Sequence, residues 1–380
     1  MQHSEKRLEI VDVLRGWALL IVVVCNYTGF AYNEKGMIQG KGIISEIIQT
    51  FEEIFFSAKG WSLLFVLFGF GFGYFTKNDR KISDSIIIKR MLILFVFAII
   101  NSLIYDGDIL RDYTFLGLIL ILFYRLSTKK LAIIGLIMFL IIPFLSAYIN
   151  KSDTTFVDNQ IKLIENLRYS YNVLDVFKYN FWSSYYYEII NLGYSITAHF
   201  VMFICMLVGI VLQKTNFFVD LKSHHKKIKT TAIITFFFSI FTSLILFYSF
   251  KNKLNYLNYF SLYYWIVLST MIFTASSICL LYLNKKCKNL FNSFSIIGKM
   301  TLTNYMMQNF IGLFIFQGIG LRLFHTMPYY FYFLFAILVY TIQVYMSKWW
   351  LKNYKYGPVE FIWRKLSKHN SQKDIVLKKN

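Results

Sequence analysis

Acidic side chains cluster in a short segment between two apolar runs of this sequence. The segment 101–113 reads Asn-Ser-Leu-Ile-Tyr-Asp-Gly-Asp-Ile-Leu-Arg-Asp-Tyr. Closely spaced carboxylates can hold an acceptor hydroxyl, act as a general base or orient a histidine. Asp106 and Asp108 are therefore candidate catalytic residues. In the alternative interpretation, Asp108 caps the following helix and Arg111 pairs with Asp112 or Asp106.

A histidine lies well inside one of the apolar runs. His199 follows the start of that run, near Ile190, by about two helical turns. An imidazole inside a membrane is a candidate base or ligand-contacting group, because polar groups there are costly to keep without a role. The alternative is a histidine that only forms a hydrogen bond across a helix interface.

Three polar residues share one face of the first apolar run. At about 100° per residue, Asp12, Arg15 and Asn26 fall within roughly 60° of one another around a helix. Lipid disfavours such a stripe, since a charge at the bilayer centre costs at least about 2.5 kcal/mol. The pattern predicts an internal helix that lines a polar interior. Alternatively, Asp12 and Arg15 form a pair near the headgroups that serves only orientation.

A second polar stripe occurs late in the chain. Thr301, Asn304, Gln308 and Gly312 follow the spacing i, i+3, i+7, i+11 and so lie on one helix face. The two striped helices come from opposite ends of the sequence. They suggest a shared polar interior.

Composition indicates a polytopic membrane protein. Of the 380 residues, 57% are hydrophobic and 20% aromatic, with only 3 prolines. The cysteines show no spacing typical of a disulfide framework or a zinc site, so no metal is expected. The Phe-Gly-Phe-Gly-Phe-Gly run ending at Gly73 has glycines at 69 and 73 in the small-xxx-small spacing of closely packed helices.

The expected fold is all-α, with about ten transmembrane helices in a single domain, residues 1–366. Apolar runs long enough to cross about 30 Å of hydrocarbon begin near Ile10, Ile54, Ile86, Ile109, Leu131, Ile190, Thr230, Asn258, Thr301 and Tyr329. Residues 150–189 form an inserted loop that is rich in aromatic residues. Its composition predicts one or two amphipathic helices at the outer interface, and a role as a lid is an open alternative. Residues 367–380 form a basic tail, expected to be disordered.

The net charge of +20 is a topology signal. Most of the 40 Lys and Arg residues lie in the termini and in alternate loops, which places both termini in the cytoplasm by the positive-inside rule. Membrane lipid is the expected partner of the basic surface, and no nucleic-acid partner is expected. A homodimer is left open.

Several motifs together resemble the YeiB-like bacterial membrane proteins, a family defined as a domain of unknown function. The matching segments are Asp12-Val-Leu-Arg15-Gly16 with Asn26, Phe65-Val-Leu-Phe68-Gly69-Phe-Gly71, Gly107-Asp108-Ile-Leu with Tyr113, 298–308 of the ninth span, and Tyr356-Gly-Pro-Val-Glu-Phe-Ile-Trp-Arg364. The first-span pattern is also similar to that of the lysosomal heparan-glucosaminide acetyltransferases. These enzymes belong to a larger group of membrane acyltransferases, which pass an acyl group from cytoplasmic acyl-CoA to an acceptor, usually a sugar, on the other side of the membrane.

The resemblance implies an acyltransferase of the bacterial cytoplasmic membrane, with acyl-CoA as donor and an envelope hydroxyl or amine as acceptor. It assigns Arg15 to the phosphates or pantetheine of the donor, because guanidinium suits phosphate contacts. The catalytic histidine of the heparan enzymes follows the first-span Asn, and the corresponding region after Asn26 has no histidine. Asn101 stands where YeiB-like chains often have a histidine. The base would then be Asp108 or His199, with a helix-terminal backbone donor or Asn304 stabilising the oxyanion.

Two other functions remain open from the sequence. In a transporter or flippase, the same polar stripes line a substrate path. In a membrane partner without enzymatic activity, the polar residues only join helices, at about 0.6 kcal/mol for each hydrogen bond.

Overall fold

The computed structural model describes residues 8–32, 36–38, 42–76, 83–149 and 151–367, and nearly all of its elements are helices. Within these ranges the β pairing is limited to one bridge between Tyr32 and Ile38. In chain order the helices are α1 (Glu9–Gly29), α2 (Ile43–Phe55), α3 (Lys59–Phe75), α4 (Asp84–Ile104), α5 (Leu110–Leu120), α6 (Thr128–Ile149), α7 (Thr155–Ile164), η2 (Glu165–Tyr169), α8 (Val173–Tyr185), η3 (Tyr186–Ile190), α9 (Leu192–Lys214), α10 (His225–Lys251), η4 (Asn255–Asn258), α11 (Tyr263–Leu283), α12 (Lys288–Gly298), α13 (Thr301–Phe316), α14 (Tyr329–Asn353) and α15 (Pro358–Ser367). The predicted all-α fold is confirmed for the described residues.

Eight helical segments of the described chain are long and apolar enough to cross a membrane. They are α1, the broken pair α2–α3 and helices α4, α6, α9, α10, α11 and α14. The expected spans at Ile109 and Thr301 are the shorter helices α5, with 11 residues, and α13, with 16. At 1.5 Å per residue these reach only about 17 Å and 24 Å, less than the hydrocarbon thickness. The predicted count of ten full-length spans is therefore not reached.

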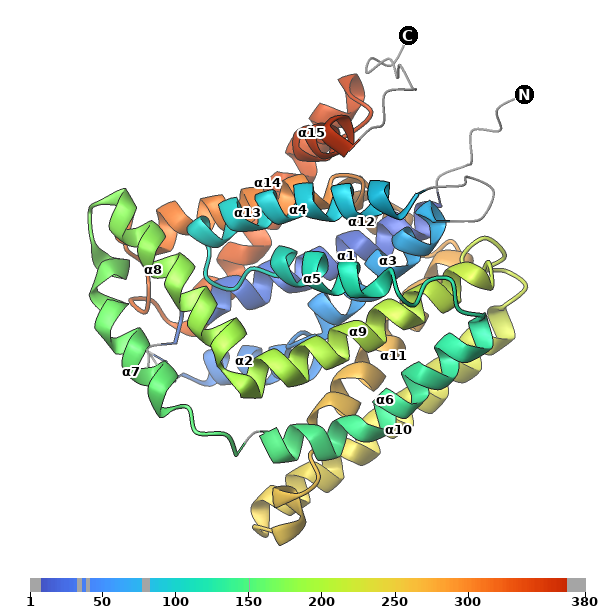
Figure 1. Ribbon diagram of the computed structural model, residues 1–380, viewed down its shortest axis with the longest axis horizontal. Coiled ribbons are helices and arrows are strands. Elements are labelled where there is room, and N and C mark those ends of the chain that lie inside the picture. The colour runs from blue at the N-terminus through green and yellow to red at the C-terminus, as the bar shows by residue number, and fades with distance from the viewer. Residues whose placement is uncertain (1–7, 33–35, 39–41, 77–82, 150, 368–380) are drawn as a thin grey trace.

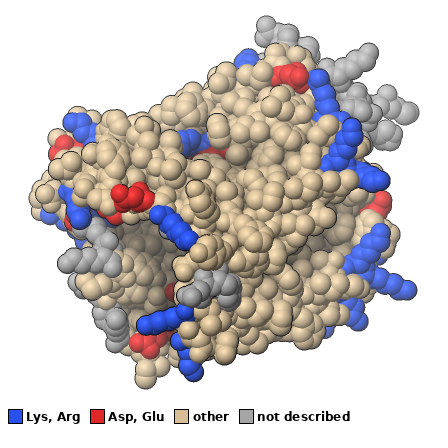
Figure 2. All heavy atoms as spheres, turned by 60° about the horizontal axis from the view of Figure 1, so that its bottom comes forward, with Lys and Arg blue, Asp and Glu red and all other residues tan. Residues whose placement is uncertain are grey.

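The two ends of the helical bundle carry different structures (Figure 1). The α5–α6 and α9–α10 connections lie on the right of the view, whereas α7 and α8 lie at the opposite end, on the left. In Figure 2, Lys and Arg side chains gather along the same right-hand edge, and the middle of this face is mostly uncharged. This arrangement is that of a bundle with two polar ends and an apolar girdle.

Helix α1 is internal, as its polar stripe predicts. Of an 18-residue apolar stretch of α1, 72% is buried inside the protein, compared with 11% of the equivalent stretch of α10. It packs against α3, α12, α13 and α14. Glycines let α12 approach closely, since a Cβ on Gly16 would lie 2.0 Å from the Phe294 carbonyl oxygen and one on Gly298 would lie 1.9 Å from that of Asp12.

The contact between α3 and α9 is equally close. A Cβ on Gly69 would lie 2.1 Å from the carbonyl oxygen of Met206, and one on Gly209 would lie 2.0 Å from that of Val66. The predicted role of Gly69 in close helix packing is thus confirmed, and Gly73 similarly packs against Gln213.

Substitution Gly69→Ala is expected to lower the free energy of unfolding by about 1–3 kcal/mol, because the added methyl group forces two backbones apart. Gly135→Ala is a matched control on α6, since a Cβ there meets no atom within 4 Å. Alanine also has the higher helix propensity, so this control should be neutral or slightly stabilising. The midpoints of thermal unfolding in detergent measure the stability of the Gly69→Ala and Gly135→Ala variants. Equal midpoints for the two variants would contradict the packing argument.

The inserted loop forms two helices, α7 and α8, that cover one end of the bundle. The amphipathic helices expected there are thus present. Asn180 of α8 donates to the carbonyl oxygens of Leu103 and Ile104 at 2.9 and 3.0 Å, and its amide exchanges two hydrogen bonds with Gln317. The guanidinium of Arg168 lies between the rings of Tyr179 and Phe324. These contacts bind α8 and η2 to the rest of the bundle.

The Gly-Pro-Val-Glu motif near the C-terminal end has a structural role. Glu360 of α15 accepts hydrogen bonds from the backbone N–H groups of Leu302 and Thr303, at 2.7 and 3.1 Å. These donors lie at the N-terminus of α13, where a carboxylate satisfies unpaired N–H groups and the helix dipole. The motif thus fixes the start of α13, which carries the second polar stripe.

Candidate functional site

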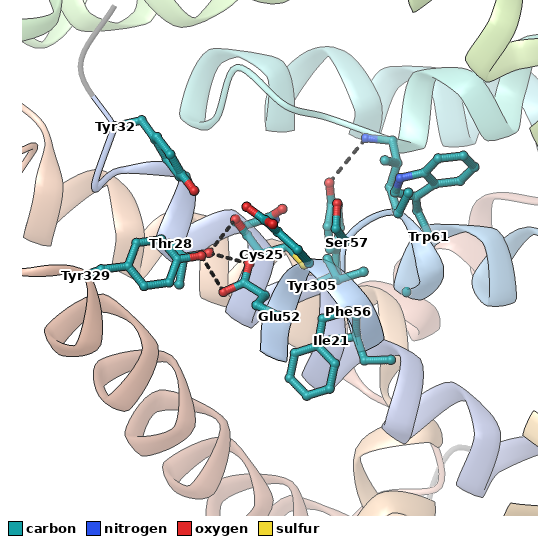
Figure 3. Close-up of a pocket in the computed structure, with 17 residues that line it drawn as sticks. Ile21, Cys25, Thr28, Tyr32, Glu52, Phe56, Ser57, Trp61, Tyr305 and Tyr329 are labelled. Atoms are coloured by element: carbon teal, nitrogen blue, oxygen red, sulfur yellow. Dashed lines mark hydrogen bonds between the residues drawn. The ribbon is translucent and has the colours of Figure 1, made fainter. Parts of the chain in front are cut away.

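A cavity of about 320 Å³ lies between α1, the α2–α3 break and α13 (Figure 3). Its walls combine aromatic and polar side chains, and a left-handed residue, Ala58 with φ 62°, allows the turn that separates α2 from α3. The lining includes Cys25, Asn26, Thr28, Tyr32, Glu52, Glu53, Phe56, Trp61, Tyr305 and Tyr329. A break in a helix thus opens space inside the bundle.

The carboxylate of Glu52 is the central polar group of this cavity. It accepts a hydrogen bond from the Thr28 hydroxyl at 2.7 Å and another from the Tyr329 hydroxyl at 2.8 Å. Glu52 is only 6% exposed, and Figure 3 shows the three side chains converging. The Cys25 thiol is a further hydrogen-bond partner of this carboxylate. A carboxylate held in this way at the wall of a cavity can bind a cation or accept a proton.

A chain of amides, half-buried at Asn26 and buried at Asn309 and Asn101, leads from the cavity to Asp108. Asn26, which lines the cavity, donates to Asn309 at 3.4 Å, and Asn309 donates to Asn101 at 3.3 Å. Asn101 in turn donates to the Asp108 carboxylate at 2.8 Å. Tyr305 also lines the cavity, and its hydroxyl lies 3.2 Å from the same carboxylate. The structure therefore brings together three of the predicted site residues, Asn26, Asn101 and Asp108.

Asp108 lies in the turn between α4 and α5 and is fully buried. Its carboxylate also accepts the backbone N–H of Leu110 at 3.1 Å, so it caps α5 as the alternative interpretation expected. Burial raises the pKa of this carboxyl to about 6, although the hydrogen bonds from Leu110 and Asn101 partly offset the effect.

This pKa predicts a pH dependence of stability. Because the folded-state pKa of about 6 exceeds the ordinary value of 3.8, the folded protein binds more protons between these values, and stability falls as pH rises through them. The loss is about 3 kcal/mol for a shift of this size. Thermal midpoints of the wild type and Asp108→Asn between pH 4 and 8 measure it, and the wild type should lose more stability. A pH-independent difference would contradict the assignment.

His199 belongs to a separate cluster at the contact of α5, α9 and η3. One ring nitrogen lies 3.0 Å from the Asp112 carboxylate and the other faces the backbone oxygen of Ser195. Both nitrogens therefore face oxygen acceptors, an arrangement typical of imidazolium. The hydrogen bond across a helix interface, which was the alternative for this residue, is confirmed.

The other charged side chains of the acidic turn have partners that the sequence did not predict. Arg111 pairs with Glu188 of η3 instead of Asp112 or Asp106, and Asp106 pairs with Arg168 at 2.9 Å. The expected Arg111 pairing is therefore wrong. The partners come from the inserted loop, which is distant in sequence, so local spacing did not reveal them.

Asp12 and Arg15 lie at the other end of α1 from the cavity. Their side chains form the expected pair at 3.3 Å. Asp12 is 1% exposed at its side chain, whereas Arg15 is 29% exposed. The Asp12–Arg15 pair thus combines a buried carboxylate with an accessible guanidinium.

The stripe on α13 makes mainly helix–helix contacts. The Thr301 hydroxyl donates to the Gly298 carbonyl, and Asn304 donates to Ser347 of α14 at 2.9 Å. Gln308 is buried, and its backbone oxygen accepts a hydrogen bond from Tyr27 of α1. The stripe does face a shared interior with α1, but the residues of α13 nearest the cavity network are Tyr305 and Asn309, which sequence spacing missed.

Glu52 is the main site residue that the sequence interpretation missed. It precedes the second apolar run, whose start was placed near Ile54, so it was assigned to a flanking loop. The available signal was the helical periodicity of residues 43–55. It predicts an additional helix directly before the second apolar run, and Glu52 lies in that helix. Among the described residues no group of three or more His, Cys, Asp and Glu side chains fits a metal ion.

The fold and the site define a class: an all-helical protein with membrane-length helices and a polar cavity inside the bundle. The model of a family described as "Protein of unknown function (DUF418)" matches residues 212–370. The chain is 26% identical to the uncharacterized protein YxaH of Bacillus subtilis (strain 168), over 95% of this chain and 94% of that protein. It is 25% identical to an uncharacterized 39.9 kDa protein in the amylase 3' region of Bacillus acidopullulyticus, over 99% and 97% of the two chains. No solved structure matches this chain.

Proposed function

We propose that this protein is a membrane-embedded acyltransferase that moves an acyl group from cytoplasmic acyl-CoA to a small acceptor held in the cavity. The observation that carries the proposal is a carboxylate, Glu52, held by Thr28 and Tyr329 at the wall of a cavity inside the bundle. The resemblance to the YeiB-like proteins and the wider acyltransferase group supports it. Both termini are assigned to the cytoplasm of a bacterial cell by the distribution of basic residues.

In the proposed reaction Glu52 acts as the general base. It accepts a proton from the nucleophilic hydroxyl or amine of the acceptor, which then attacks the thioester carbonyl carbon. A C–O or C–N bond forms and the C–S bond breaks. The proton on Glu52 then passes to the departing thiolate, so the carboxylate is restored.

One side chain at the cavity wall is suited to stabilising the developing oxyanion. The Asn26 amide lines the cavity, and one of its two N–H groups is left for an oxyanion when the other donates to Asn309 at 3.4 Å. The single O–H of Tyr305 donates to Asp108 at 3.2 Å, so this hydroxyl is not a donor to the oxyanion. Asp108 holds Tyr305 at the cavity wall and is therefore a positioning residue in this proposal.

The donor is assigned to the opposite end of α1. Arg15 precedes Asn26 by eleven residues on the same helix face, or about 16 Å along the axis. If Arg15 binds the nucleotide part of acyl-CoA, the flexible pantetheine arm extends along α1 toward the cavity. A guanidinium suits the phosphates of this donor.

Thermal stability with a panel of CoA thioesters tests the proposal. A ligand at 100 times its dissociation constant should stabilise the wild type by about 2.7 kcal/mol. Arg15→Ala should lose this shift, whereas Lys130→Ala, an exposed control at the same end of the bundle, should retain it. If no thioester stabilises the wild type, the donor assignment is wrong and the proposal fails with it.

One observation favours a transporter as the second candidate. Helices α2 and α3 are separated by a break that borders the cavity, and discontinuous helices at a binding site are typical of transporters. Uptake of labelled substrate into vesicles, without release of CoA, would favour this alternative.

A further inference from the structure

The cavity has a composition that favours a positively charged occupant. Two carboxylates, Glu52 and Glu53, line it, and among the described residues no basic side chain lies within 4.0 Å of the Glu52 carboxylate. The nearby ammonium of Lys59 donates to the backbone oxygen of Glu53 at 2.7 Å and lies outside the lining. A buried carboxylate without a cation is costly, and a cationic ligand removes that cost.

The aromatic walls point to the same chemistry. Five aromatic side chains line the cavity, and Tyr32 and Tyr329 meet edge to face at 5.9 Å beside Glu52. Ring faces attract ammonium groups, more strongly where water is excluded. Figure 3 shows Tyr32 and Tyr329 near Glu52, with Phe56, Trp61 and Tyr305 across the cavity.

Hydrogen-bonding capacity also remains at the carboxylate. The Thr28 hydroxyl uses one acceptor site on one Glu52 oxygen, the Tyr329 hydroxyl uses one site on the other, and the Cys25 thiol uses a third site of this carboxylate. Each carboxylate oxygen has about two such sites. An ammonium group supplies three N–H donors, whereas an alcohol supplies a single O–H.

We infer that the occupant of this cavity is a small primary amine, bound as its ammonium ion against Glu52 and the aromatic walls. The volume of about 320 Å³ lies at the lower end of ligand pockets, which suits a molecule of the size of an amino sugar. This inference rests on the proposed function in one respect only, namely that the bound amine is the acyl acceptor.

For an amine acceptor the balanced reaction consumes the ammonium ion and the thioester and yields an amide, a free thiol and one proton. Glu52 accepts the first N–H proton, which exposes the nitrogen lone pair. The C–N bond then forms as the C–S bond breaks, and the second N–H proton goes to the thiolate. The first proton leaves Glu52 for solvent, so the carboxylate is restored. One proton is released for each amide formed near neutral pH, whereas ester formation from an alcohol releases none.

Calorimetric binding without any acyl donor tests the inference. Matched pairs that differ in one group, such as glucosamine with glucose and 2-phenylethylamine with 2-phenylethanol, would be titrated into the detergent-purified full chain. At least one amine should bind at least tenfold more tightly than its alcohol. Glu52→Gln should abolish this preference, while Glu46→Gln, at an exposed position outside the cavity lining, should keep it.

The outcomes separate this inference from the proposed function. Equal binding of amines and alcohols by the wild type, or binding of neither, overturns the inference whether or not the Glu52 variant folds. Amine binding without any transfer from acyl-CoA supports the inference and overturns the acyltransferase proposal. Transfer to alcohols alone, with no proton release, supports that proposal and overturns the inference.

Discussion

Replacement of Glu52 by glutamine is expected to lower kcat for acyl transfer by about 10²–10⁴-fold, the usual contribution of a general base. Glutamine has nearly the same shape, and its amide oxygen can still accept one of the two hydrogen bonds from Thr28 and Tyr329. Its NH2 group donates to the other hydroxyl, which turns to accept. It cannot accept a proton from the acceptor. The loss should therefore appear in the chemical step, measured as CoA release with acyl-CoA and an amine acceptor.

The matched control for this variant is Glu46→Gln. Glu46 lies on the same helix, α2, but is exposed and outside the cavity lining, so kcat should be unchanged. A thermal midpoint of Glu52→Gln close to that of the wild type shows that the fold is retained. If a folded Glu52→Gln protein keeps wild-type kcat, Glu52 is not the base.

The largest loss of stability is expected for Arg168→Ala. Arg168 forms a partly buried ion pair with Asp106 at 2.9 Å, and its guanidinium packs against Tyr179 and Phe324. Removing one partner of a fully buried pair leaves an uncompensated charge and costs about 3–5 kcal/mol, so we expect a loss near the lower end, about 3 kcal/mol. The midpoint of thermal or denaturant-induced unfolding in detergent measures this loss.

A control and a rescue make this result specific. Lys162→Ala removes an exposed basic residue from α7 and should change stability by less than about 0.5 kcal/mol. The double variant Arg168→Met with Asp106→Asn removes both charges and should recover part of the loss. A single Arg168→Ala variant as stable as Lys162→Ala would show that the ion pair does not hold the outer helices in place.

The helical architecture was largely predictable because hydrophobic length is a local property of the sequence. Apolar runs marked the membrane-length helices, and the aromatic-rich composition of the inserted loop indicated α7 and α8. The spans expected at Ile109 and Thr301 were overestimated because apolar residues continue beyond the helix ends. The run near Ile109 ends in turns after Leu120, and that near Thr301 ends at Phe316.

The partners of polar residues were predictable only where they are near in sequence. The i, i+3 pair of Asp12 and Arg15 and the capping role of Asp108 follow from helical spacing and were anticipated. The pairs of Asp106 with Arg168 and of Arg111 with Glu188 join segments more than sixty residues apart. No local pattern encodes such contacts, because they depend on how the inserted loop folds over the bundle.

The sequence by itself determined that this is an all-helical protein with membrane-length helices and a first helix that faces a polar interior, since periodicity and hydrophobic length govern both properties. Only the tertiary structure decided where the cavity lies and which carboxylate serves it. Glu52 reaches that position because α2 breaks from α3 at Ala58 and packs against α1 and α14. Helix packing brings Thr28, Glu52 and Tyr329 together from three distant segments, and this convergence creates the site.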